Sequence, residues 1–369
     1  MSYKVNAVLF NRMIEESSRV AVSTHMNPDG DAVGSSCAIA LYLKGRGKDV
    51  HIVIPDMVPE NLDFAIDRET AGMIEHDVEK GKKFLLEADL VISTDYNNPD
   101  RAGDFAQAVK ESKARKVLMD HHPNPATGFY DIVFSRETVS SACEVVYWLL
   151  LEMPGIDRDP AALGPEIGRL LMLGMTTDSN NFSNSTFPST LRMAGGLLDA
   201  GVDRENILDG LYNNYRENRF RLMGYFLSSK LKITPDGVAY AVFSSKELKR
   251  FDIREGETEG FVNMPLGIDR VRMSVFIKED ADRLRVSVRS VKGVSANRCA
   301  RMYFNGGGHE NAAGGRLLVP GDIASVSEAE SYVEKCCAGF FSDPDLWRSG
   351  ENQEKRDMEF PERKTEKQL

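Results

Sequence analysis

Short apolar runs alternate with longer, helix-like segments through the first half of the chain. Four of these runs are continuously apolar, which is typical of strands that are buried on both faces of a parallel sheet. They lie at residues 19–24, 49–55, 90–95 and 116–120. Helix-like segments occupy residues 32–44 and 140–152, and the second has capping-box spacing from Ser141 to Glu144. This order predicts an α/β domain with a mostly parallel, doubly wound sheet that carries its site at the carboxyl ends of the strands.

The pattern changes after about residue 195. Residues 209–230 combine charged and amide side chains with periodic Leu, Tyr, Phe and Met, which predicts a helical connector. A turn signal at residues 235–237 is followed by alternating polarity, which predicts strands and then a helix. These elements are expected at residues 238–244, 271–278, 284–290 and 296–304. We therefore expect a second, smaller α/β domain after the connector.

The length of 369 residues also favours two domains, because it exceeds what one hydrophobic core normally serves. We expect a first domain at residues 1–195, the connector at 196–234, a second domain at 235–345 and a charged tail at 346–369. The last nineteen residues carry five basic and six acidic side chains and almost nothing apolar. We expect this tail to be disordered, since burial cannot offset its ordering entropy.

Composition excludes several classes of protein. Hydrophobic residues make up 42% of the chain and charged residues 28%, which is typical of a globular protein. No apolar run approaches the roughly 18 to 20 residues of a membrane-spanning helix, so we expect no membrane partner. The five cysteines form neither a disulfide framework nor a CxxC motif, and the N-terminus lacks the pattern of a secretory signal. These features favour a cytoplasmic protein.

Charge is distributed unevenly along the chain. The net charge of −10 makes long nucleic acid a poor partner, because binding to its backbone depends on basic side chains. Between residues 270 and 316, however, ten Lys and Arg residues stand against four acidic residues, a local balance of +6. This segment is expected to bind an anion.

One candidate site follows the first predicted strand. The sequence His25-Met-Asn-Pro-Asp29-Gly-Asp31 places a histidine and two carboxylates on one tight turn, where they could bind neighbouring cations. The same segment also suits a plain turn, and Asp31 could simply cap the next helix.

Three more candidate segments contain ionisable side chains at the ends of predicted elements. Asp120-His121-His122 ends a strand, and adjacent histidines on extended backbone point in different directions, so one can bind a metal while the other faces substrate. Asp95 ends the strand at residues 90–95, and Asp178 follows an apolar helix. A single aspartate at such a place is more often a turn or cap residue. Four segments at the same edge of one sheet favour a shared site.

These segments resemble a known family. HMNPDGD, STDYNNPDRAG, LMDHH and MTTDSNNF resemble, in order, the four motifs of the DHH phosphoesterases. In the second half, the sequence SVRS at residues 287–290 and the run GGGHENAAGG at residues 306–315 resemble the DHH-associated domain. The two-domain length is most similar to the nano-RNase and phosphoadenosine phosphate (pAp) phosphatase branch.

The resemblance implies two Mn²⁺ ions per chain, with Mg²⁺ or Co²⁺ as substitutes. The implied ligands are His25, Asp29 and Asp95 for one ion, and Asp31, Asp95, His121 and Asp178 for the other. Carboxylate and imidazole ligands suit such ions better than a closed zinc site. Cations also explain how the clustered aspartates coexist, because their mutual repulsion would otherwise raise some of their pKa values.

The resemblance also implies residues that act on the substrate. Asp120 is expected to orient a histidine, and His122 is expected to contact the substrate phosphate or the leaving group. Arg101 corresponds to a position that reaches the site, although an exposed loop arginine is the alternative. Arg289 ends a predicted strand, where its planar guanidinium can bind a phosphate in bidentate fashion.

A glycine-rich segment completes the expected substrate site. Gly306, Gly307 and Gly308 allow the backbone to approach an anion closely, and His309 can donate a hydrogen bond or stack on a base. A plain turn is the alternative for the glycines. The small residues at 312–315 favour close contact with a ligand or with other backbone.

The implied function is metal-dependent hydrolysis of short 5′-phosphorylated oligonucleotides to mononucleotides, and also of 3′-phosphoadenosine 5′-phosphate. Other possible enzymatic activities are hydrolysis of linear or cyclic dinucleotides, exopolyphosphatase or pyrophosphatase activity, and exonuclease activity on long single strands. A nucleotide-binding regulator without activity is the alternative outside the enzymes. The sequence leaves a homodimer open, and long duplex nucleic acid is not an expected partner.

Overall fold

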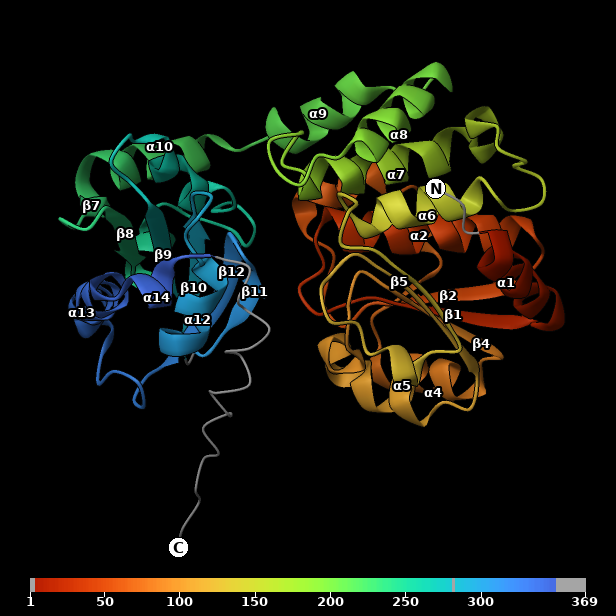
Figure 1. The fold of residues 1–369 in the computed structure, drawn as a ribbon, viewed down its shortest axis with the longest axis horizontal. Coiled ribbons are helices and arrows are strands. Elements are labelled where there is room, and N and C mark those ends of the chain that lie inside the picture. The colour runs from red at the N-terminus through yellow and green to blue at the C-terminus, as the bar shows by residue number, and fades with distance from the viewer. Residues whose placement is uncertain (1–3, 281–282, 350–369) are drawn as a thin grey trace, which may run out of the picture. The chain divides into compact units, whose positions relative to one another are not determined.

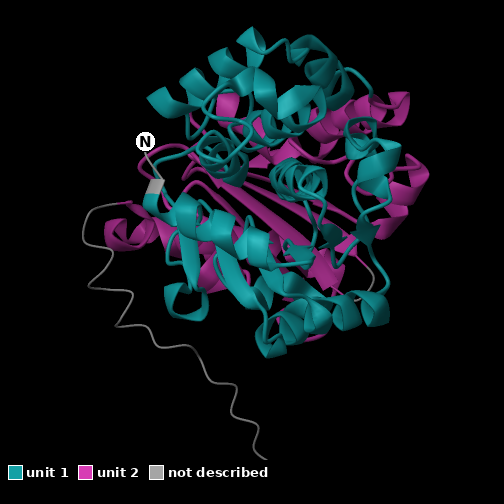
Figure 2. Ribbon diagram, turned by 90° about the vertical axis from the view of Figure 1, so that its right-hand side faces the viewer, with its two compact units in different colours: residues 1–214 teal, residues 215–369 magenta. Residues whose placement is uncertain are grey.

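The computed structural model describes residues 4–280 and 283–349. The chain forms two compact units, Met1–Asn214 and Tyr215–Leu369, which are coloured separately in Figure 2. From residue 350 onward, the tail expected at residues 346–369 lies outside the described residues. None of the helices in the described ranges is long and apolar enough to cross a membrane.

Unit 1 is built on a six-stranded parallel sheet with the strand order β3-β2-β1-β4-β5-β6. The strands are β1 (Arg19–Ser23), β2 (Asp49–Val53), β3 (Ile74–Glu75), β4 (Leu90–Thr94), β5 (Arg115–Asp120) and β6 (Ile132–Ser135). The order reverses between β1 and β4, since β2 and β3 lie on one side of β1 while β5 and β6 lie beyond β4. Such a switch point is where open α/β sheets bind their ligands.

Helices cover both faces of this sheet (Figure 1). On one face lie α1 (Lys4–Glu16), α2 (Gly30–Gly45) and α6 (Ala142–Leu150). Beyond them α7 (Gly164–Asp178), α8 (Pro188–Asp199) and α9 (Arg204–Tyr212) form an outer layer of the same core. The other face packs against α4 (Val78–Glu87) and α5 (Ala106–Glu111). Short helical segments are α3 (Arg68–Ala71) and the 3-10 turns at Glu60–Ala65, Pro99–Phe105, Thr127–Phe129 and Pro160–Leu163. Successive strand residues feed the two cores, as with Val91 and Ile92, because side chains alternate across a strand.

Unit 2 contains a mixed six-stranded sheet with the order β11-β12-β10-β9-β8-β7. The strands are β7 (Lys232–Ile233), β8 (Val238–Phe243), β9 (Met273–Asp280), β10 (Arg283–Ser290), β11 (Gly307–His309) and β12 (Ala312–Leu318). Only β8 and β9 pair in parallel among these described strands. The helices are α10 (Glu217–Tyr225), α11 (Ser245–Arg250), α12 (Ala296–Tyr303), α13 (Ala329–Ser342) and α14 (Pro344–Trp347), with 3-10 turns at Phe261–Gly267 and Val326–Glu328 and a π turn at Phe226–Lys230.

The two faces of the second sheet differ in character. Even-numbered residues of β10, such as Val286 and Val288, pack with α12 and α13 in the main core of unit 2. A smaller aromatic cluster around Phe226, Phe261 and Phe276 covers part of the opposite face. The odd-numbered residues of β10 on that face remain partly exposed.

The predicted α/β class is confirmed, and the predicted strands and helices of both halves appear with small shifts at their ends. The helical segment expected at residues 196–234 is shared between the units, since α9 belongs to unit 1 and α10 to unit 2. The structure also decides two local alternatives. Asp29, not Asp31, caps α2, because the Asp29 carboxylate accepts hydrogen bonds from the amides of residues 31 and 32. The capping box is only half formed, since Ser141 caps α6 while the Glu144 carboxylate binds other residues.

Candidate active site

The candidate residues of unit 1 gather where three central strands end. His25 lies just after β1, Asp95 directly follows β4, and Asp120 is the last residue of β5. Because the carboxyl ends of neighbouring parallel strands meet at one edge of the sheet, these residues come together at the switch point between β1 and β4. The start of α2 and the end of α7 add further acidic side chains to the same edge.

Three groups of candidate ligand atoms share Asp95; the third consists of Asp95, Asp120 and His122, and the other two contain expected metal ligands. The first group contains His25, Asp29 and Asp95, with 3.2 Å between His25 Nε2 and Asp95 Oδ2. The second contains Asp31, Asp95 and His121, and within each group the ligand atoms lie within 4.8 Å of one another. His121 Nε2 is 3.5 Å from Asp95 Oδ1 and 3.9 Å from Asp31 Oδ2.

Asp178, at the end of α7, lies beside the second group. Its Oδ2 atom is 3.3 Å from His121 Nε2, and its side chain is about one quarter exposed, while that of Asp95 is nearly buried. The structure therefore brings together all six residues that the sequence suggests as metal ligands.

Asp95 adopts an unusual backbone conformation. Its φ angle is +61°, in the left-handed region that residues other than glycine rarely adopt and that aspartate tolerates better than most. Its amide still donates to the Met119 carbonyl at 3.0 Å, although β4 ends one residue earlier, at Thr94. The buried Asp95 Oδ1 atom has no hydrogen-bond partner among the described residues. A strained residue with an unsatisfied buried oxygen at the centre of a site is typical of a ligand position.

The carboxylate of Asp31 is held from behind by the first turn of α6. The amide of Ala142 donates to Asp31 Oδ2 at 2.6 Å, and the amide of Cys143 donates to Asp31 Oδ1 at 2.8 Å. Both amides belong to the amino end of a helix, where free N–H groups and the helix dipole favour a negative charge. This anchoring fixes the direction in which Asp31 can offer its remaining lone pairs.

Glycine at position 174 allows α7 to approach Asp31 closely. A Cβ atom built there would lie 2.7 Å from Asp31 Oδ1 and 2.9 Å from Asp31 Cα, and it would overlap Cys143 Sγ. Gly34 of α2 lies in the same contact, since its Cβ would meet Cys143 Sγ and the Leu170 carbonyl. The close packing of α2, α6 and α7 thus depends on residues without side chains.

Glu144, which sequence reasoning assigned only to a helix cap, is a buried hydrogen-bond acceptor. Its Oε2 atom accepts from the Ser140 amide and hydroxyl, each at 2.8 Å, and from the Thr190 hydroxyl at 2.6 Å. Trp148 Nε1 donates to Oε1 at 3.3 Å. The carboxylate thereby fixes the segment that leads into α6 and ties it to α8. An acidic residue inside the apolar helix sequence ACEVVYWLL was the available signal.

The ionisation of the site reflects burial and close charges. Burial opposes a charge on the histidines, yet Asp95 raises the pKa of His25 to about 9, and Asp178 and Asp95 raise that of His121 to about 10. Burial would raise the pKa of Asp95, but hydrogen bonds from His121 and His25 hold it well below its usual range. Burial and the charge of Asp95 raise the pKa of Asp31 well above its usual range, and burial raises that of Asp178 to about 7. Protons here balance charges that cations would otherwise balance.

A second chain of contacts runs beside the ligand groups. Arg101 Nη1 lies 3.0 Å from His122 Nε2, and His122 Nδ1 lies 2.8 Å from Asp120 Oδ1. Because arginine only donates, Nε2 accepts, and the proton on Nδ1 is donated to Asp120. Arg101 also accepts a hydrogen bond from the Met26 amide through its carbonyl at 2.9 Å, which connects this chain to the turn that follows His25.

The donor set fits divalent cations of the Mn²⁺ or Mg²⁺ type. It consists of carboxylate oxygens and imidazole nitrogens, and the nearby Cys143 thiol interacts with backbone carbonyls instead. Asp95 Oδ1 makes no hydrogen bond within the described part of the chain and lies 3.5 Å from His121 Nε2, and burial raises the pKa of Asp31. Both carboxylates could therefore accept a cation in place of protons.

The candidate residues of unit 2 lie near one end of its sheet. Arg289 of β10 pairs with Ala312 of β12, which in turn pairs with His309 of β11. Arg289 Nη1 donates to the carbonyls of Val288 and Ala313 at 3.0 and 3.2 Å. The row that links these strands therefore combines a half-buried guanidinium with a histidine.

The glycines of this segment are required by backbone contacts. A Cβ atom at Gly306 would overlap the Gly314 carbonyl, and one at Gly308, where φ is +147°, would lie 2.7 Å from the Ala312 carbonyl. Asn297 Oδ1 accepts a hydrogen bond from the Gly308 amide at 3.1 Å. Close pairing of β11 with β12 thus accounts for two of the three glycines.

The fold and the shared donor set define a class: an enzyme with a divalent-metal site at the switch point of a parallel sheet, joined to a second α/β unit. Residues 19–175 match the N-terminal domain of the DHH family, and residues 236–334 match the DHHA1 domain. The chain belongs to the DHH family and is a hydrolase.

Known proteins resemble the chain along most of its length. The bifunctional oligoribonuclease and PAP phosphatase NrnA of Bacillus subtilis is 28% identical over 308 residues, which cover 83% of this chain and 91% of the relative. The protein of the same name from Thermus thermophilus is 29% identical over 304 residues, covering 81% and 84%. The crystal structure of an exopolyphosphatase-related protein from Bacteroides fragilis superposes with a TM-score of 0.85 at 31% identity, covering 94% of this chain and all of that one.

We expect Gly174→Ala to lower the affinity for Mn²⁺ by at least about tenfold, because the new methyl group displaces the Asp31 carboxylate from its anchored position. Calorimetric titration with Mn²⁺ measures the affinity, and circular dichroism checks that the helices remain. Gly195→Ala in α8 is the matched control, since a Cβ there would meet nothing within 4 Å. Wild-type affinity in Gly174→Ala would contradict the proposed role of this packing.

Proposed function

We propose that this enzyme hydrolyses short 5′-phosphorylated oligonucleotides to mononucleotides and removes a phosphate group from 3′-phosphoadenosine 5′-phosphate. The observation that carries the proposal is the pair of ligand groups that share Asp95 beside the chain Arg101, His122 and Asp120. The similarity to two bifunctional oligoribonuclease and PAP phosphatases, each over more than four fifths of the chain, supports this substrate class.

Two Mn²⁺ ions are the proposed cofactors, and Mg²⁺ or Co²⁺ can replace them. The residues that would hold one ion are His25, Asp29 and Asp95, and those for the other are Asp31, Asp95, His121 and Asp178. A pair of divalent cations neutralises phosphoryl oxygens and activates water for in-line attack. The residues around them fix their direction, above all Asp31 through the amides of α6.

His122 handles the proton at the leaving group in this proposal. Asp120 accepts a hydrogen bond from the Nδ1–H group of His122. This bond orients the imidazole in both its neutral and its charged form. Arg101 donates to Nε2 in the free enzyme. When a phosphate binds, the guanidinium can donate to its oxygens instead, so that Nε2 is free to take up a proton from solvent and then donate it to the leaving oxygen.

Unit 2 is proposed to bind the part of the substrate that is remote from the bond being cleaved. Arg289 would hold a phosphate, and His309 would donate a hydrogen bond to it or stack on a base. Gly307 is the one of the three glycines whose Cβ would have side chains, those of Asn297 and Arg301, and not backbone as its nearest contacts. Interactions far from the reacting atoms raise affinity and position the substrate.

Polyphosphate hydrolysis is the second candidate function. The similarity to the exopolyphosphatase-related protein of Bacteroides fragilis favours it. A polyphosphate has no base for a histidine to stack on, and the same ions and arginine would bind its phosphates. A comparison of substrates decides between the two.

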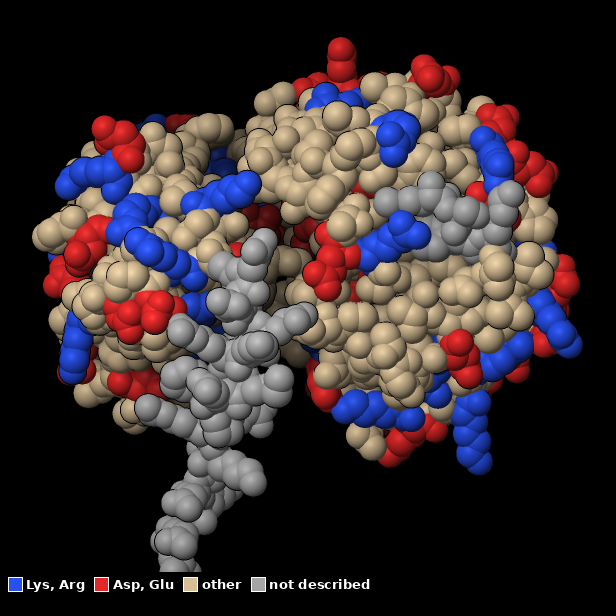
Figure 3. Space-filling model, in the orientation of Figure 1, with Lys and Arg blue, Asp and Glu red and all other residues tan. Residues whose placement is uncertain are grey.

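The distribution of charge supports short substrates, and the state of the cysteines supports a cytoplasmic location. Basic and acidic side chains are interspersed on the face of the molecule shown in Figure 3. With a net charge of −10, the chain offers little counterion release to a long strand. All five cysteines are free and buried, as suits a reducing compartment.

Asp95→Asn should reduce kcat by on the order of a thousandfold or more, because the shared carboxylate serves both ions and removal of its charge weakens both. Asp29→Asn, which affects one ligand group, should have a smaller effect. Steady-state turnover with Mn²⁺ measures both variants, and Asp236→Asn in an exposed turn is the control. Near-wild-type turnover in Asp95→Asn would rule out the shared site.

Arg289→Ala should raise KM for a dinucleotide about tenfold or more while the protein keeps its metal content, because this residue belongs to unit 2 and the ligands belong to unit 1. Arg289→Lys keeps the positive charge but lacks the planar guanidinium. Its KM for the dinucleotide should therefore lie between those of the wild type and Arg289→Ala. Metal analysis and kinetics together test the division of roles. Loss of metal from Arg289→Ala would speak against it.

A substrate panel tests the function itself. With Mn²⁺, kcat/KM should be highest for oligonucleotides of about two to five units, substantial for 3′-phosphoadenosine 5′-phosphate and low for long single strands. A chelator should abolish all of these activities. Faster consumption of polyphosphate than of any oligonucleotide would replace the first proposal by the second.

A further inference from the structure

Three basic side chains lie side by side across the sheet of unit 2. Arg285 of β10 pairs directly with Lys278 of β9 and with Arg316 of β12. Directly paired residues of antiparallel strands point to the same face of a sheet, so these three side chains form one row, which we name the basic row. Like charges in such positions repel each other, and the row therefore favours an anion.

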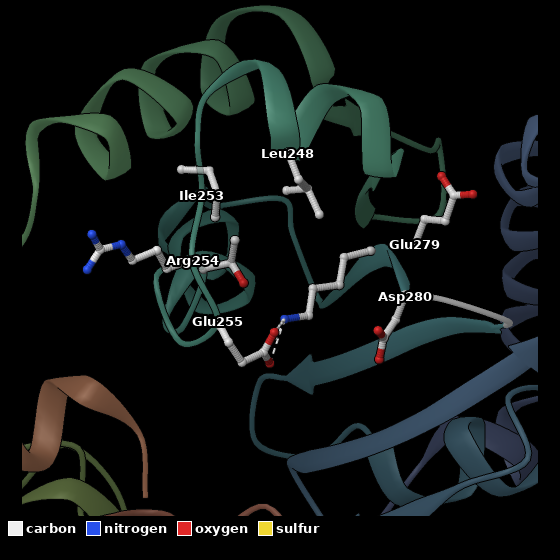
Figure 4. A pocket seen from close by; sticks show the side chains of 8 residues that line it. Leu248, Ile253, Arg254, Glu255, Glu279 and Asp280 are labelled. Atoms are coloured by element: carbon white, nitrogen blue, oxygen red, sulfur yellow. Dashed lines mark hydrogen bonds and ion pairs between the residues drawn. The ribbon is translucent and has the colours of Figure 1, made fainter. Parts of the chain in front are cut away.

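An acidic side chain from a neighbouring loop already binds part of the basic row. Both carboxylate oxygens of Glu255 lie within about 3 Å of Lys278 Nζ, and Oε1 also accepts from Arg285 Nη1. Glu255 and Lys278 line a hollow beside the sheet, and Figure 4 shows Glu255 at the edge of that hollow. The Glu255 side chain is 73% exposed, whereas that of Lys278 is only 16% exposed. The two cations thus converge on one oxyanion that solvent can reach and a stronger anion can replace.

The hollow itself does not suit an anion. Glu279 and Asp280 line it together with Glu255, so its acidic side chains outnumber the lysine and arginine that line it. Glu279 is also engaged elsewhere, because its Oε2 atom accepts from the Ser245 amide at 2.7 Å. The anion-binding surface is therefore the row on the sheet and not the hollow beside it.

The basic row shares its sheet face with the proposed substrate residue Arg289. Along β10, residues 285, 287 and 289 point to the same side, because side chains alternate. Four residues of an antiparallel strand span about 13 Å. Between the two arginines the face carries Ser287, paired with Gly314, which is paired in turn with Gly307. On its other side Ser287 pairs with Phe276, so the aromatic cluster covers the β9 end of this line of paired residues. The hydroxyl and the two glycines carry no long side chain over its β10, β12 and β11 part.

We propose that the basic row is a second phosphate subsite, which binds a phosphodiester group of the oligonucleotide further along the strand than the group held at Arg289. This inference rests on the proposed function and specifies its substrate class: molecules with several phosphate groups along an extended backbone. Glu255 occupies the subsite in the free enzyme, and the substrate phosphate displaces it. Guanidinium groups and an ammonium group are the donors that bind phosphate most strongly.

The test compares a long and a short substrate on the same variant. In the double variant Arg285→Ala, Arg316→Ala, KM for a five-nucleotide RNA should rise about five- to tenfold, and KM for 3′-phosphoadenosine 5′-phosphate should not change. The Kd of a labelled five-nucleotide RNA should rise in parallel and depend less steeply on salt. Glu255→Gln should lower KM for the five-nucleotide RNA about two- to threefold, because it removes the competing charge.

Lys249→Ala, which removes one exposed charge from α11, is the control and should leave both substrates unaffected. An unchanged KM and Kd for the longer RNA in the double variant would overturn the subsite, and so would an equal rise in KM for both substrates. The two proposals can fail separately. If the wild-type enzyme hydrolyses neither substrate, the proposed function is wrong. If the double variant nevertheless binds the five-nucleotide RNA more weakly than the wild type, the subsite is still supported.

Discussion

Three carboxylates, those of Asp31, Asp95 and Asp120, are buried at one edge of the parallel sheet. A buried negative charge is costly, so the fold depends on groups that compensate these charges. Each is compensated in a different way. Helix amides hold Asp31, two histidines contact Asp95, and His122 binds Asp120. Divalent cations would complete the compensation, because amides and histidines still leave the pKa of Asp31 raised well above its usual range. The switch point of the sheet, the glycines of α2 and α7 and the left-handed conformation of Asp95 all serve to bring these groups together.

The two units position their candidate site residues with different kinds of sheet. In unit 1, parallel strands buried on both faces bring ligands from distant parts of the sequence to one edge. In unit 2, an antiparallel region leaves part of one face exposed, and arginines and glycines on its paired strands form the rows that we propose as phosphate sites. A metal site needs fixed oxygens at short distances, while recognition of a flexible polyanion needs donors spaced along an extended surface.

Much of the fold and of the candidate site could be predicted from the sequence, because both depend on local signals. Continuous apolar runs marked the strands, and short motifs at their ends marked the ligands. The supports could not be predicted in this way, because they connect residues far apart in the chain. The bonds from residues 142 and 143 to Asp31 span more than a hundred positions, and the role of Glu144 depends on Thr190 of α8. The basic row was invisible for a related reason: the sequence showed a local charge of +6 but not the strand register that aligns Lys278, Arg285 and Arg316.

Because Asp31 is anchored inside the core of unit 1, the stability of this unit should depend on how much metal is available. The amides that orient this ligand also begin a helix of the main core, so the site cannot be assembled unless the helices around it are packed. A cation that binds only the folded state stabilises it by mass action, by about 2.7 kcal/mol when its free concentration is a hundred times Kd. In a cell short of divalent metal, unit 1 would open more often than it does with metal bound, and proteases would then remove the inactive enzyme.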